Sequence, residues 1–353
     1  MIKEKIIDTH MHLEAWENEE FDFIDCFEQY KRKAGVESIN ICAVPTAQRN
    51  VCNNIMLGLY KLANDNTFVH AGLDHIIYPI TEDMPVGMDL VTQYRELMEI
   101  GFDGIKLIEG KPIVLKSLGN NLNHPALNKL YAEMERDGTH VVFHIADPDD
   151  CWDITKTSQD FIDKGWFYGD GTYLTLEETY EQADKIFNSY PNLKVTLAHL
   201  YFCGERPEKL VDLFEKYPNL CVDLTPGCEM YHSFERHNEY YKEFFEKYSD
   251  RVLIGTDGTF PSLSKCHEWC IEILYDFIAT DKKNMAFDDS ILTGICLSQG
   301  AKENILYKNY ERRVGASPKK IDKEKFKAYI EKYSSLIEKR DMERLKPYIE
   351  RYL

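Results

Sequence analysis

The stretch that decides the fold is Lys5-Ile6-Ile7-Asp8-Thr9-His10-Met11-His12, near the start of the chain. Its apolar beginning predicts a buried strand. A strand projects alternate side chains to one face, so Asp8, His10 and His12 are expected to point together from its tip. Two imidazoles held in this way are well placed to bind one divalent metal ion. Two nearby histidines can also be accidental, so the meaning of the pair depends on the rest of the chain.

Composition limits the partners that the protein can have. The chain has 353 residues, of which 44% are hydrophobic and 12% aromatic, as expected for a globular protein with a sizeable core. It carries 60 acidic and 42 basic residues, for a formal charge of −18. Such a surface repels phosphate groups and anionic lipids, so neither nucleic acid nor a membrane is an expected partner. A small-molecule substrate is expected instead.

Cysteine usage indicates a reducing compartment. Several of the ten cysteines lie inside apolar runs, such as Ile41-Cys42-Ala43-Val44, and no Cys-x-x-Cys pair occurs. These cysteines are expected to be buried and reduced. Without a signal sequence or an apolar run of transmembrane length, the chain is predicted to be cytoplasmic.

Short apolar segments alternate with amphipathic helical segments through most of the chain. The predicted strands span residues 4–9, 37–44, 67–73, 103–108, 139–145, 193–199, 220–225 and 251–256. Near-continuous apolar strands that alternate with helices indicate a parallel sheet. Eight such units predict an α/β fold of the (β/α)₈ TIM-barrel type. An open doubly wound sheet is the alternative, but the glycine-rich turn expected after its first strand is replaced by the histidine motif.

Two segments depart from a plain barrel. Residues 1–310 are predicted to form the barrel, and residues 317–353 a C-terminal helical extension that packs on the barrel or on a partner subunit. A homodimer is therefore expected. Residues 146–174 form a long insertion after the fifth strand, with Trp152, Trp166, Phe167 and Tyr168 among its aromatic residues. Long loops at this end of a barrel are often functional, although such aromatics also serve to fix a loop to the body.

Further histidine and aspartate residues follow later strands. His144 ends the fifth predicted strand, His199 ends the sixth, and Asp257 follows the eighth. Since the carboxyl ends of barrel strands meet at one mouth, these side chains are expected to converge with His10 and His12. The sequence therefore predicts a polar site at this mouth.

The chain resembles the amidohydrolase superfamily, and more narrowly its branch of metal-dependent hydrolases related to aminocarboxymuconate-semialdehyde decarboxylase. The matching pieces are Asp8-x-His10-x-His12, the segment Gly101-Phe102-Asp103-Gly104-Ile105-Lys106-Leu107, His144, His199, Gly255-Thr256-Asp257 and the late segment Gly300-Ala301-Lys302-Glu303-Asn304-Ile305-Leu306-Tyr307. They span roughly residues 5–308.

The resemblance implies roles for the clustered residues. His10, His12, His144 and Asp257 would be metal ligands, and His199 would polarise the water or the substrate carbonyl. Such a ligand set suits zinc, with manganese or iron as alternatives, and leaves a position for water. His199 and Asp257 would be the catalytic residues that move protons.

Lys106 leaves the number of metal ions open. In binuclear members of the superfamily a carboxylated lysine at the end of strand four bridges two metals, whereas the narrower branch has one metal; one ion is favoured here. Lys106 would otherwise bind a substrate carboxylate or pair with Glu109. His75 and Arg49 follow the third and second strands and are weaker substrate-site candidates. Asp8 would either bond an imidazole or cap the strand turn.

The sequence therefore predicts a metal-dependent hydrolase that attacks an amide, ester or lactone bond of a small organic acid. The first alternative is a metal-dependent decarboxylase of an unsaturated or aromatic carboxylic acid, because both reactions need one Lewis acid and one proton shuttle. The second is a non-catalytic barrel that binds a metabolite.

Overall fold

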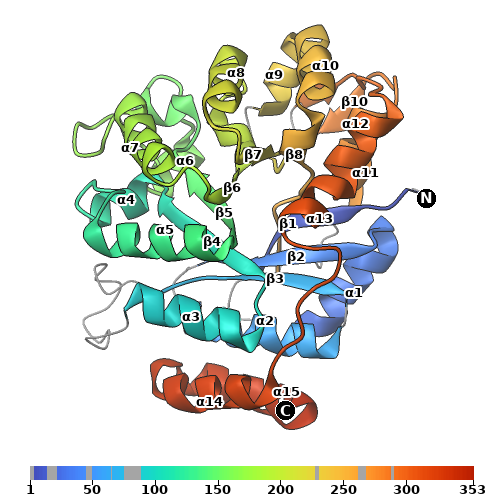
Figure 1. Ribbon diagram of the computed structural model, residues 1–353. Helices are drawn as coiled ribbons and strands as arrows, with labels where there is room; N and C mark the ends of the chain where they lie inside the picture. The colour runs from blue at the N-terminus through green and yellow to red at the C-terminus, as the bar shows by residue number, and fades with distance from the viewer. Residues whose placement is uncertain are drawn as a thin grey trace.

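A single curled sheet of parallel strands forms the centre of the molecule (Figure 1). The computed structural model describes residues 4–13, 22–44, 50–64, 66–74, 89–226, 230–260, 268–287 and 290–353. The sheet order is β8-β7-β6-β5-β4-β3-β2-β1-β9. The strands are β1 (Ile7–Leu13), β2 (Ser38–Ala43), β3 (Thr67–Ala71), β4 (Gly104–Gly110), β5 (His140–Ile145), β6 (Lys194–Leu197), β7 (Leu220–Asp223), β8 (Val252–Leu253) and β9 (Gly258–Phe260).

The first and last strands meet and close the barrel. β8 and β9 are two parts of one last strand, and β9 pairs in parallel with β1, so that Met11 lies opposite Gly258. Between them, the Thr9 amide donates to the Ile254 carbonyl at 3.0 Å, and the Asp257 amide donates to the His10 carbonyl at 2.9 Å. The predicted TIM barrel is confirmed, and the predicted strand 251–256 is the start of this interrupted strand.

Helices surround the sheet, and most follow a strand of the barrel (Figure 1). They are α1 (Phe23–Ala34), α2 (Asn50–Ala63), α3 (Leu90–Ile100), α4 (Pro112–Ser117), α5 (Pro125–Asp137), α6 (Gln159–Asp163), α7 (Leu176–Ser189), α8 (Pro207–Lys216), α9 (Met230–Arg236), α10 (Asn238–Lys247), α11 (Glu268–Ala279), α12 (Gln299–Glu303), α13 (Asn309–Arg313), α14 (Lys323–Tyr333) and α15 (Lys339–Tyr352). A π-helical turn spans Asn304–Lys308, and a small antiparallel pair joins β10 (Met285–Phe287) to β11 (Ser290–Leu292).

Local sequence explains where α7 begins. The Thr175 hydroxyl accepts from the Glu178 amide, and the Glu178 side chain accepts from the Thr175 amide, which forms a capping box. The helix therefore starts immediately after the insertion 146–174, as the sequence predicts. The insertion is not structureless, since it contains α6 and a 3₁₀ turn at Asp149–Trp152.

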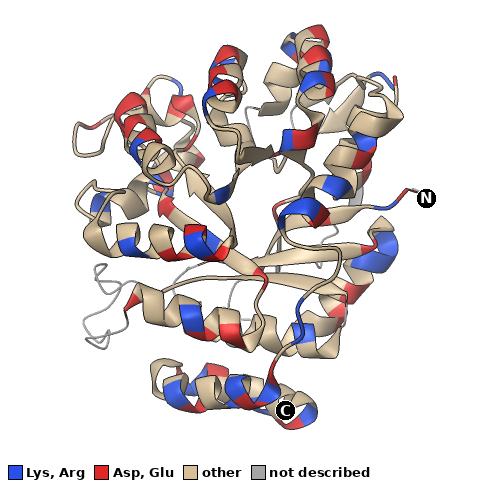
Figure 2. Cartoon of the chain, viewed as in Figure 1, with Lys and Arg blue, Asp and Glu red and all other residues tan. Residues whose placement is uncertain are grey.

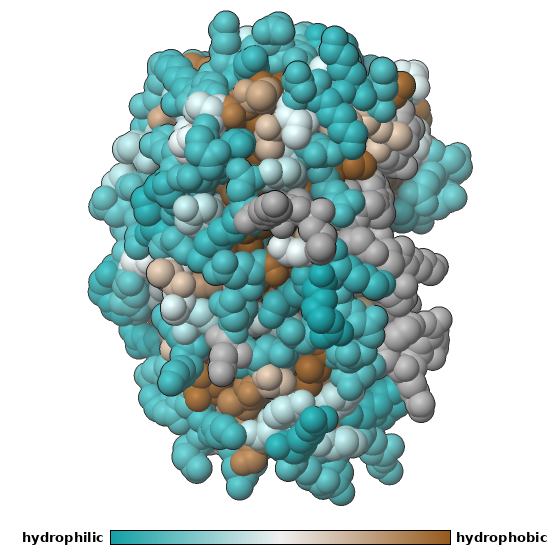
Figure 3. Space-filling model, turned by 90° about the vertical axis from the view of Figure 1, so that its right-hand side faces the viewer, coloured by the Kyte–Doolittle hydropathy of each residue, from teal (hydrophilic) through white to brown (hydrophobic). Residues whose placement is uncertain are grey.

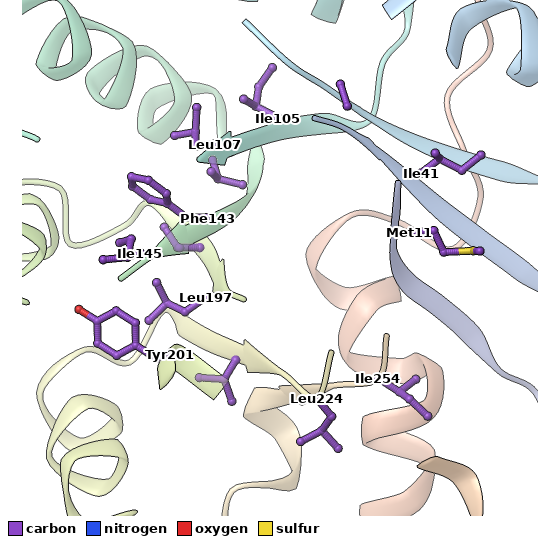
Figure 4. Close-up of a cluster of buried hydrophobic side chains, with 14 of the residues drawn as sticks. Met11, Ile41, Ile105, Leu107, Phe143, Ile145, Leu197, Tyr201, Leu224 and Ile254 are labelled. Carbon is purple, nitrogen blue, oxygen red and sulfur yellow. The ribbon is translucent and has the colours of Figure 1, made fainter. Parts of the chain in front are cut away.

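The main core lies between the sheet and the helices. Figure 4 shows side chains of successive strands in this layer, among them Met11, Ile41, Ile105, Phe143 and Leu197. Charged residues are concentrated on the helices (Figure 2), and the face shown in Figure 3 is mostly hydrophilic. Of the eight described cysteines all are free and six are buried, which agrees with the sequence analysis. No helix among the described residues is long and apolar enough to cross a membrane.

A register shift divides β1 into two parts. The shift lies between Asp8 and Met11, where β1 has one more residue than β2. Since side chains alternate along a strand, an extra residue moves the following side chains to the opposite face. Met11 consequently joins the core beside the helices, whereas Ile7 packs in a separate cluster with Phe68, Cys221, Leu253 and Tyr310.

The C-terminal extension packs on α2 and α3. Phe326 of α14 is fully buried, and its ring contacts α2 at Gly58, where a larger residue would collide with it. The segment before α14 is also fixed, because the Asp103 carboxylate accepts from the Lys319 amide at 2.8 Å and the Asp322 amide donates to the Ile100 carbonyl at 2.8 Å. The extension is thus bound to the outside of the barrel in this chain.

Replacement of Phe326 by alanine should destabilise the protein. Truncation of a buried phenylalanine typically costs about 3–5 kcal/mol, through lost burial and the cavity left behind. Urea unfolding followed by circular dichroism should show this decrease in the free energy of unfolding. The exposed neighbour Lys327, changed to alanine, serves as the control and should unfold like the wild type. An unchanged midpoint for Phe326→Ala would mean that the extension contributes no stability.

Candidate metal centre

A cavity of about 450 Å³ opens at the carboxyl ends of the strands. Its lining comes from the ends of several strands and from the insertion after β5. The lining residues are His12, Val44, Lys106, Ile108, Lys111, His144, Asp147, Pro148, Asp160, Phe161, Lys164, Trp166, His199, Phe202, Pro226, Asp257 and Thr259. This is the end of a (β/α)₈ barrel at which active sites are built.

His10 and His12 turn their Nε2 atoms toward each other at a distance of 3.1 Å. Each Nδ1 atom has an acceptor, since the His10 Nδ1 lies 2.8 Å from Asp223 Oδ2 and the His12 Nδ1 lies 3.1 Å from the Cys42 carbonyl oxygen. A carbonyl and a carboxylate can only accept, so both Nδ1 atoms carry the proton. Each Nε2 atom is therefore left as the lone-pair nitrogen that could bind a metal, and that of His10 lies 2.9 Å from the Lys106 ammonium.

Asp257 completes a group of three ligand atoms. Its Oδ1 atom lies 3.0 Å from the His12 Nε2 and 3.9 Å from the His10 Nε2. This oxygen is buried and makes no hydrogen bond to any described residue. The backbone that carries it approaches β1 closely, because a Cβ atom at Gly255 would lie 2.9 Å from the His10 Cβ. Only glycine permits this approach.

The three atoms fit a divalent metal ion. Two lone pairs and a carboxylate that face one another repel unless a cation lies among them. Ligands about 2.1 Å from a tetrahedral zinc ion would be about 3.4 Å apart, close to the separations found here. Among the described residues, His10, His12 and Asp257 are the group that could hold a metal ion in this way.

Burial and charge set the protonation of this group. Burial lowers the pKa of His10 to about 4, with the charge of Lys106 as a further cause. Burial opposes ionisation of Asp257, but its interactions with His12 hold the pKa of this carboxyl well below its usual range. A neutral His10 ring and an ionised Asp257 carboxylate are the forms that bind metal.

His144 lies in the same cavity but outside the group of three. Its Nε2 atom lies 3.1 Å from Asp147 Oδ1, and Asp147 also accepts from the Lys111 ammonium at 2.7 Å and from the Tyr168 hydroxyl at 2.6 Å. The Asp147 carboxylate thus ties His144 to the insertion. The predicted role of His144 as a fourth ligand remains a prediction.

His199 lies beside the group of three. Its ring centroid is 5.8 Å from that of His10 and 5.0 Å from that of His144. The Nδ1 atom lies 3.3 Å from the Thr225 carbonyl oxygen, which accepts its proton and leaves Nε2 as the basic atom. Burial lowers the pKa of His199 to about 3, so the ring is neutral at pH 7.

The weaker candidates have different outcomes. The Lys106 ammonium lines the cavity, 2.9 Å from the His10 Nε2, and burial lowers its pKa. His75 and Arg49 lie outside the described residues. Among the described residues, Asp8 bonds no imidazole ring, and its carboxylate accepts from the hydroxyls of Tyr30 and Thr256, each at 2.6 Å. The register shift in β1 explains this, because it places Asp8 on the opposite face from His10 and His12.

The structure adds Asp223, which the sequence analysis missed. This residue ends β7, inside the predicted strand 220–225, and its carboxylate contacts His10. The rule that found His144 and His199, a polar residue where an apolar strand ends, applies equally to Asp223.

The insertion has two sets of aromatic residues. Phe161 and Trp166 line the cavity. Trp152 and Tyr168 instead pack on each other, with ring centroids 5.1 Å apart, and the Trp152 Nε1 donates to the Leu174 carbonyl. One set therefore fixes the loop, and the other faces the cavity.

Comparisons with known proteins agree with this fold. A model of the amidohydrolase family matches residues 7–312. A search of curated proteins gave no match. Three solved structures are similar. An uncharacterised TIM-barrel protein from Bordetella bronchiseptica has a TM-score of 0.53 and 15% identity, over 87% of this chain and 97% of that one. The probable 2-pyrone-4,6-dicarboxylic acid hydrolase of Acinetobacter baumannii, with citric acid bound, has a TM-score of 0.52 and 13% identity, over 88% of this chain and 99% of that one. 2,6-Dihydroxybenzoate decarboxylase, complexed with 2,6-dihydroxybenzoate, has a TM-score of 0.50 and 13% identity, over 88% of this chain and 99% of that one.

A second pair of histidines, His70 of β3 and His140 at the start of β5, is buried and does not line the cavity. The His70 Nε2 lies 2.8 Å from the His140 Nδ1, the His70 Nδ1 lies 2.7 Å from Asn40 Oδ1, and the His140 Nε2 lies 2.8 Å from the Thr196 hydroxyl. Burial lowers the pKa of both rings well below the usual value. Both are therefore neutral in the folded protein.

The buried histidines should make the protein less stable in acid. Because the folded pKa values of His10, His70, His140 and His199 lie below the unfolded value near 6.5, the unfolded chain binds more protons below that pH. The contribution of these four rings to the free energy of unfolding should be constant above pH 6.5 and fall below it, by up to about 1.4 kcal/mol per pH unit for each ring. Urea unfolding in the presence of a metal chelator, repeated between pH 7.5 and pH 5, measures this slope.

A His140→Gln variant provides the control for this experiment. It removes one titrating ring and should give a shallower slope by about one proton. A free energy of unfolding that is equal at pH 7.5 and pH 5 would contradict the prediction.

Proposed function

The chain belongs to the amidohydrolase family, and we propose that it is a metal-dependent hydrolase of an amide, ester or lactone bond in a small organic acid. The observation that carries this proposal is the convergence of His10 Nε2, His12 Nε2 and Asp257 Oδ1 within 3.9 Å, beside a cavity that His12, Asp257 and His199 line. A zinc ion held by these atoms would supply Lewis-acid polarisation and lower the pKa of water to about 7.

The protein's own residues would then move the proton. His199 is neutral, and its Nε2 is the basic atom because Nδ1 faces the Thr225 carbonyl. It would accept a proton from water and return it to the leaving group. Asp257 is ionised and adjacent, and would share this role.

The charge of the cavity favours an anionic substrate. Its lining contains three lysines (Lys106, Lys111 and Lys164) and three aspartates (Asp147, Asp160 and Asp257), so these six charges sum to zero. A bound divalent ion would raise the sum to +2. In a chain with a formal charge of −18, such a cavity would attract an acidic molecule that the rest of the surface repels.

The aromatic lining of the cavity favours a flat molecule. Trp166, Phe161 and Phe202 contribute apolar walls, and the Lys111 ammonium lies 4.3 Å from the Trp166 ring centroid. Two of the structurally similar proteins are named for ring compounds that bear carboxyl groups. This likeness supports a planar carboxylic acid as the substrate, with a volume that a cavity of about 450 Å³ accommodates.

Decarboxylation of such an acid is the second candidate, because the barrel is similar to that of 2,6-dihydroxybenzoate decarboxylase. The same three ligands would hold the metal, and His199 would deliver a proton to carbon instead of to a leaving group.

A direct assay separates the two reactions. The zinc-loaded protein is tested on aryl lactones and N-acyl amino acids, and separately on hydroxybenzoates, in water labelled with oxygen-18. A hydrolase incorporates the label into the new carboxyl group, and His199→Asn should lower kcat by about 10²- to 10⁴-fold with zinc still bound. His124→Asn, at the start of α5 and outside the cavity, is the control and should retain activity.

Two outcomes would contradict the hydrolase. Release of carbon dioxide without incorporation of the label would establish the decarboxylase. Less than a tenth of an equivalent of bound metal after supplementation with zinc or manganese would instead indicate a non-catalytic binding barrel.

Trp166 should contribute to substrate binding. Replacement by leucine removes the aromatic face, which is worth roughly 0.5–1.5 kcal/mol, so KM for a planar acid should rise about twofold to tenfold while kcat changes little. The control is Ile154→Ala, in the same insertion but 57% exposed and outside the cavity lining. Equal KM values for wild type and Trp166→Leu would place the substrate elsewhere in the cavity.

A further inference from the structure

Asp223 contacts both halves of the proposed site. It is 1% exposed, and its Oδ2 atom lies 2.8 Å from the His10 Nδ1. Its Oδ1 atom accepts from the His199 amide at 2.9 Å and from the Thr225 amide at 3.2 Å. We propose that Asp223 is a positioning residue that fixes the metal-binding tautomer of His10 and, with its other oxygen, the place of His199. This inference rests on the proposed metal-dependent function.

The contact with His10 determines which ring nitrogen carries the proton. A carboxylate offers no proton, so the His10 Nδ1 must donate and the Nε2 must keep its lone pair. The Thr225 hydroxyl, 3.1 Å from the same Nδ1, can donate or accept and does not decide the tautomer. An aspartate carboxyl is ordinarily ionised at neutral pH, so the Asp223 oxygens act as acceptors there.

The contact with His199 holds an unusual backbone. His199, Leu200, Tyr201 and Phe202 have φ angles of 56°, 52°, 58° and 52°, a left-handed run that residues with a Cβ atom seldom adopt. Such a conformation persists only where the surroundings impose it. Asp223 Oδ1 accepts from the first amide of this run, that of His199. The Tyr180 hydroxyl donates to the Tyr201 carbonyl at 3.0 Å.

This left-handed turn decides which side chains enter the cavity. His199 and Phe202, three residues apart, both line it, with ring centroids 5.1 Å apart. Leu200 and Tyr201 between them are buried in the hydrophobic core. The amide held by Asp223 therefore begins the turn that presents the proposed proton shuttle.

Asp103 shows what a purely structural buried carboxylate looks like in this chain. It is 5% exposed, it forms an ion pair with Lys61, and it accepts from the amides of Val69 and Lys319 at 2.8 Å each. It contacts none of the proposed metal ligands. The same change from aspartate to asparagine at the two positions therefore separates positioning from general stability.

Asparagine at position 223 should reverse the tautomer of His10. If its amide oxygen continues to accept from the His199 and Thr225 amides, its NH₂ group faces the His10 Nδ1. An N–H at that place requires a lone pair on Nδ1, and the proton then moves to Nε2, which can no longer bind metal. Loss of a group that hydrogen-bonds to a metal ligand typically weakens metal affinity 10- to 100-fold.

The test measures zinc affinity at pH 7.5 by competition with a chelating dye, for apo wild type, Asp223→Asn and Asp103→Asn. We expect a 10- to 100-fold higher Kd for Asp223→Asn only, and a changed visible spectrum when cobalt replaces zinc. Tight binding by the wild type and an equal Kd for Asp223→Asn would overturn this inference alone. Absence of zinc binding by the wild type would overturn the proposed function.

A second measurement requires no variant at Asp223. Spectra of the apo wild type with nitrogen-15-labelled histidine report the tautomer of each ring, and His10→Gln identifies the signal of His10. We expect His10 to carry its proton on Nδ1. A proton on Nε2 would overturn the inference even if Asp223→Asn fails to fold.

Discussion

The site depends on the hydrogen bonds that join the first strand to the last. The Thr9 amide binds the Ile254 carbonyl, and the Asp257 amide binds the His10 carbonyl at 2.9 Å. These bonds close the barrel and hold the Asp257 carboxylate above His10 and His12. The ligands come from positions almost 250 residues apart in the chain, so no local interaction could hold them within 3.9 Å of one another. The contacts that close the barrel are therefore the contacts that bring the site together.

Electrostatics gives this closed barrel its chemical character. Buried acceptors hold the Nδ1 protons of both imidazoles, which leaves two lone pairs and a carboxylate oxygen facing one another in a buried space. The Lys106 ammonium, 2.9 Å from the His10 Nε2, is one cation near this group. A divalent ion would compensate the carboxylate and use both lone pairs. The insertion after β5 then completes a small cavity whose six charged side chains sum to zero without the ion.

Sequence periodicity predicted which strand ends form the site, but it predicted the directions and contacts of their side chains less well. His10, His12, His199 and Asp257 were found from their places at the ends of apolar strands. The side chains of His10, His12 and Asp257 converge, and His12, His199 and Asp257 line one cavity. The same alternation rule failed at Asp8, because the register shift in β1 reversed the face of the strand. His144 entered the cavity as expected, but its Nε2 atom is bound to Asp147, a contact that strand spacing does not indicate.

The sequence by itself determined the alternation of eight strands with helices, the barrel that follows from it, and the family of the chain. These depend on local periodicity and on motifs, which can be recognised from the order of residues in the sequence. Only the tertiary structure decided that Asp223 faces His10, that Phe161 and Trp166 line the cavity while Trp152 fixes the loop, and that the C-terminal extension packs on α2. Those facts depend on contacts between distant segments, and a contact has no signature in either segment alone.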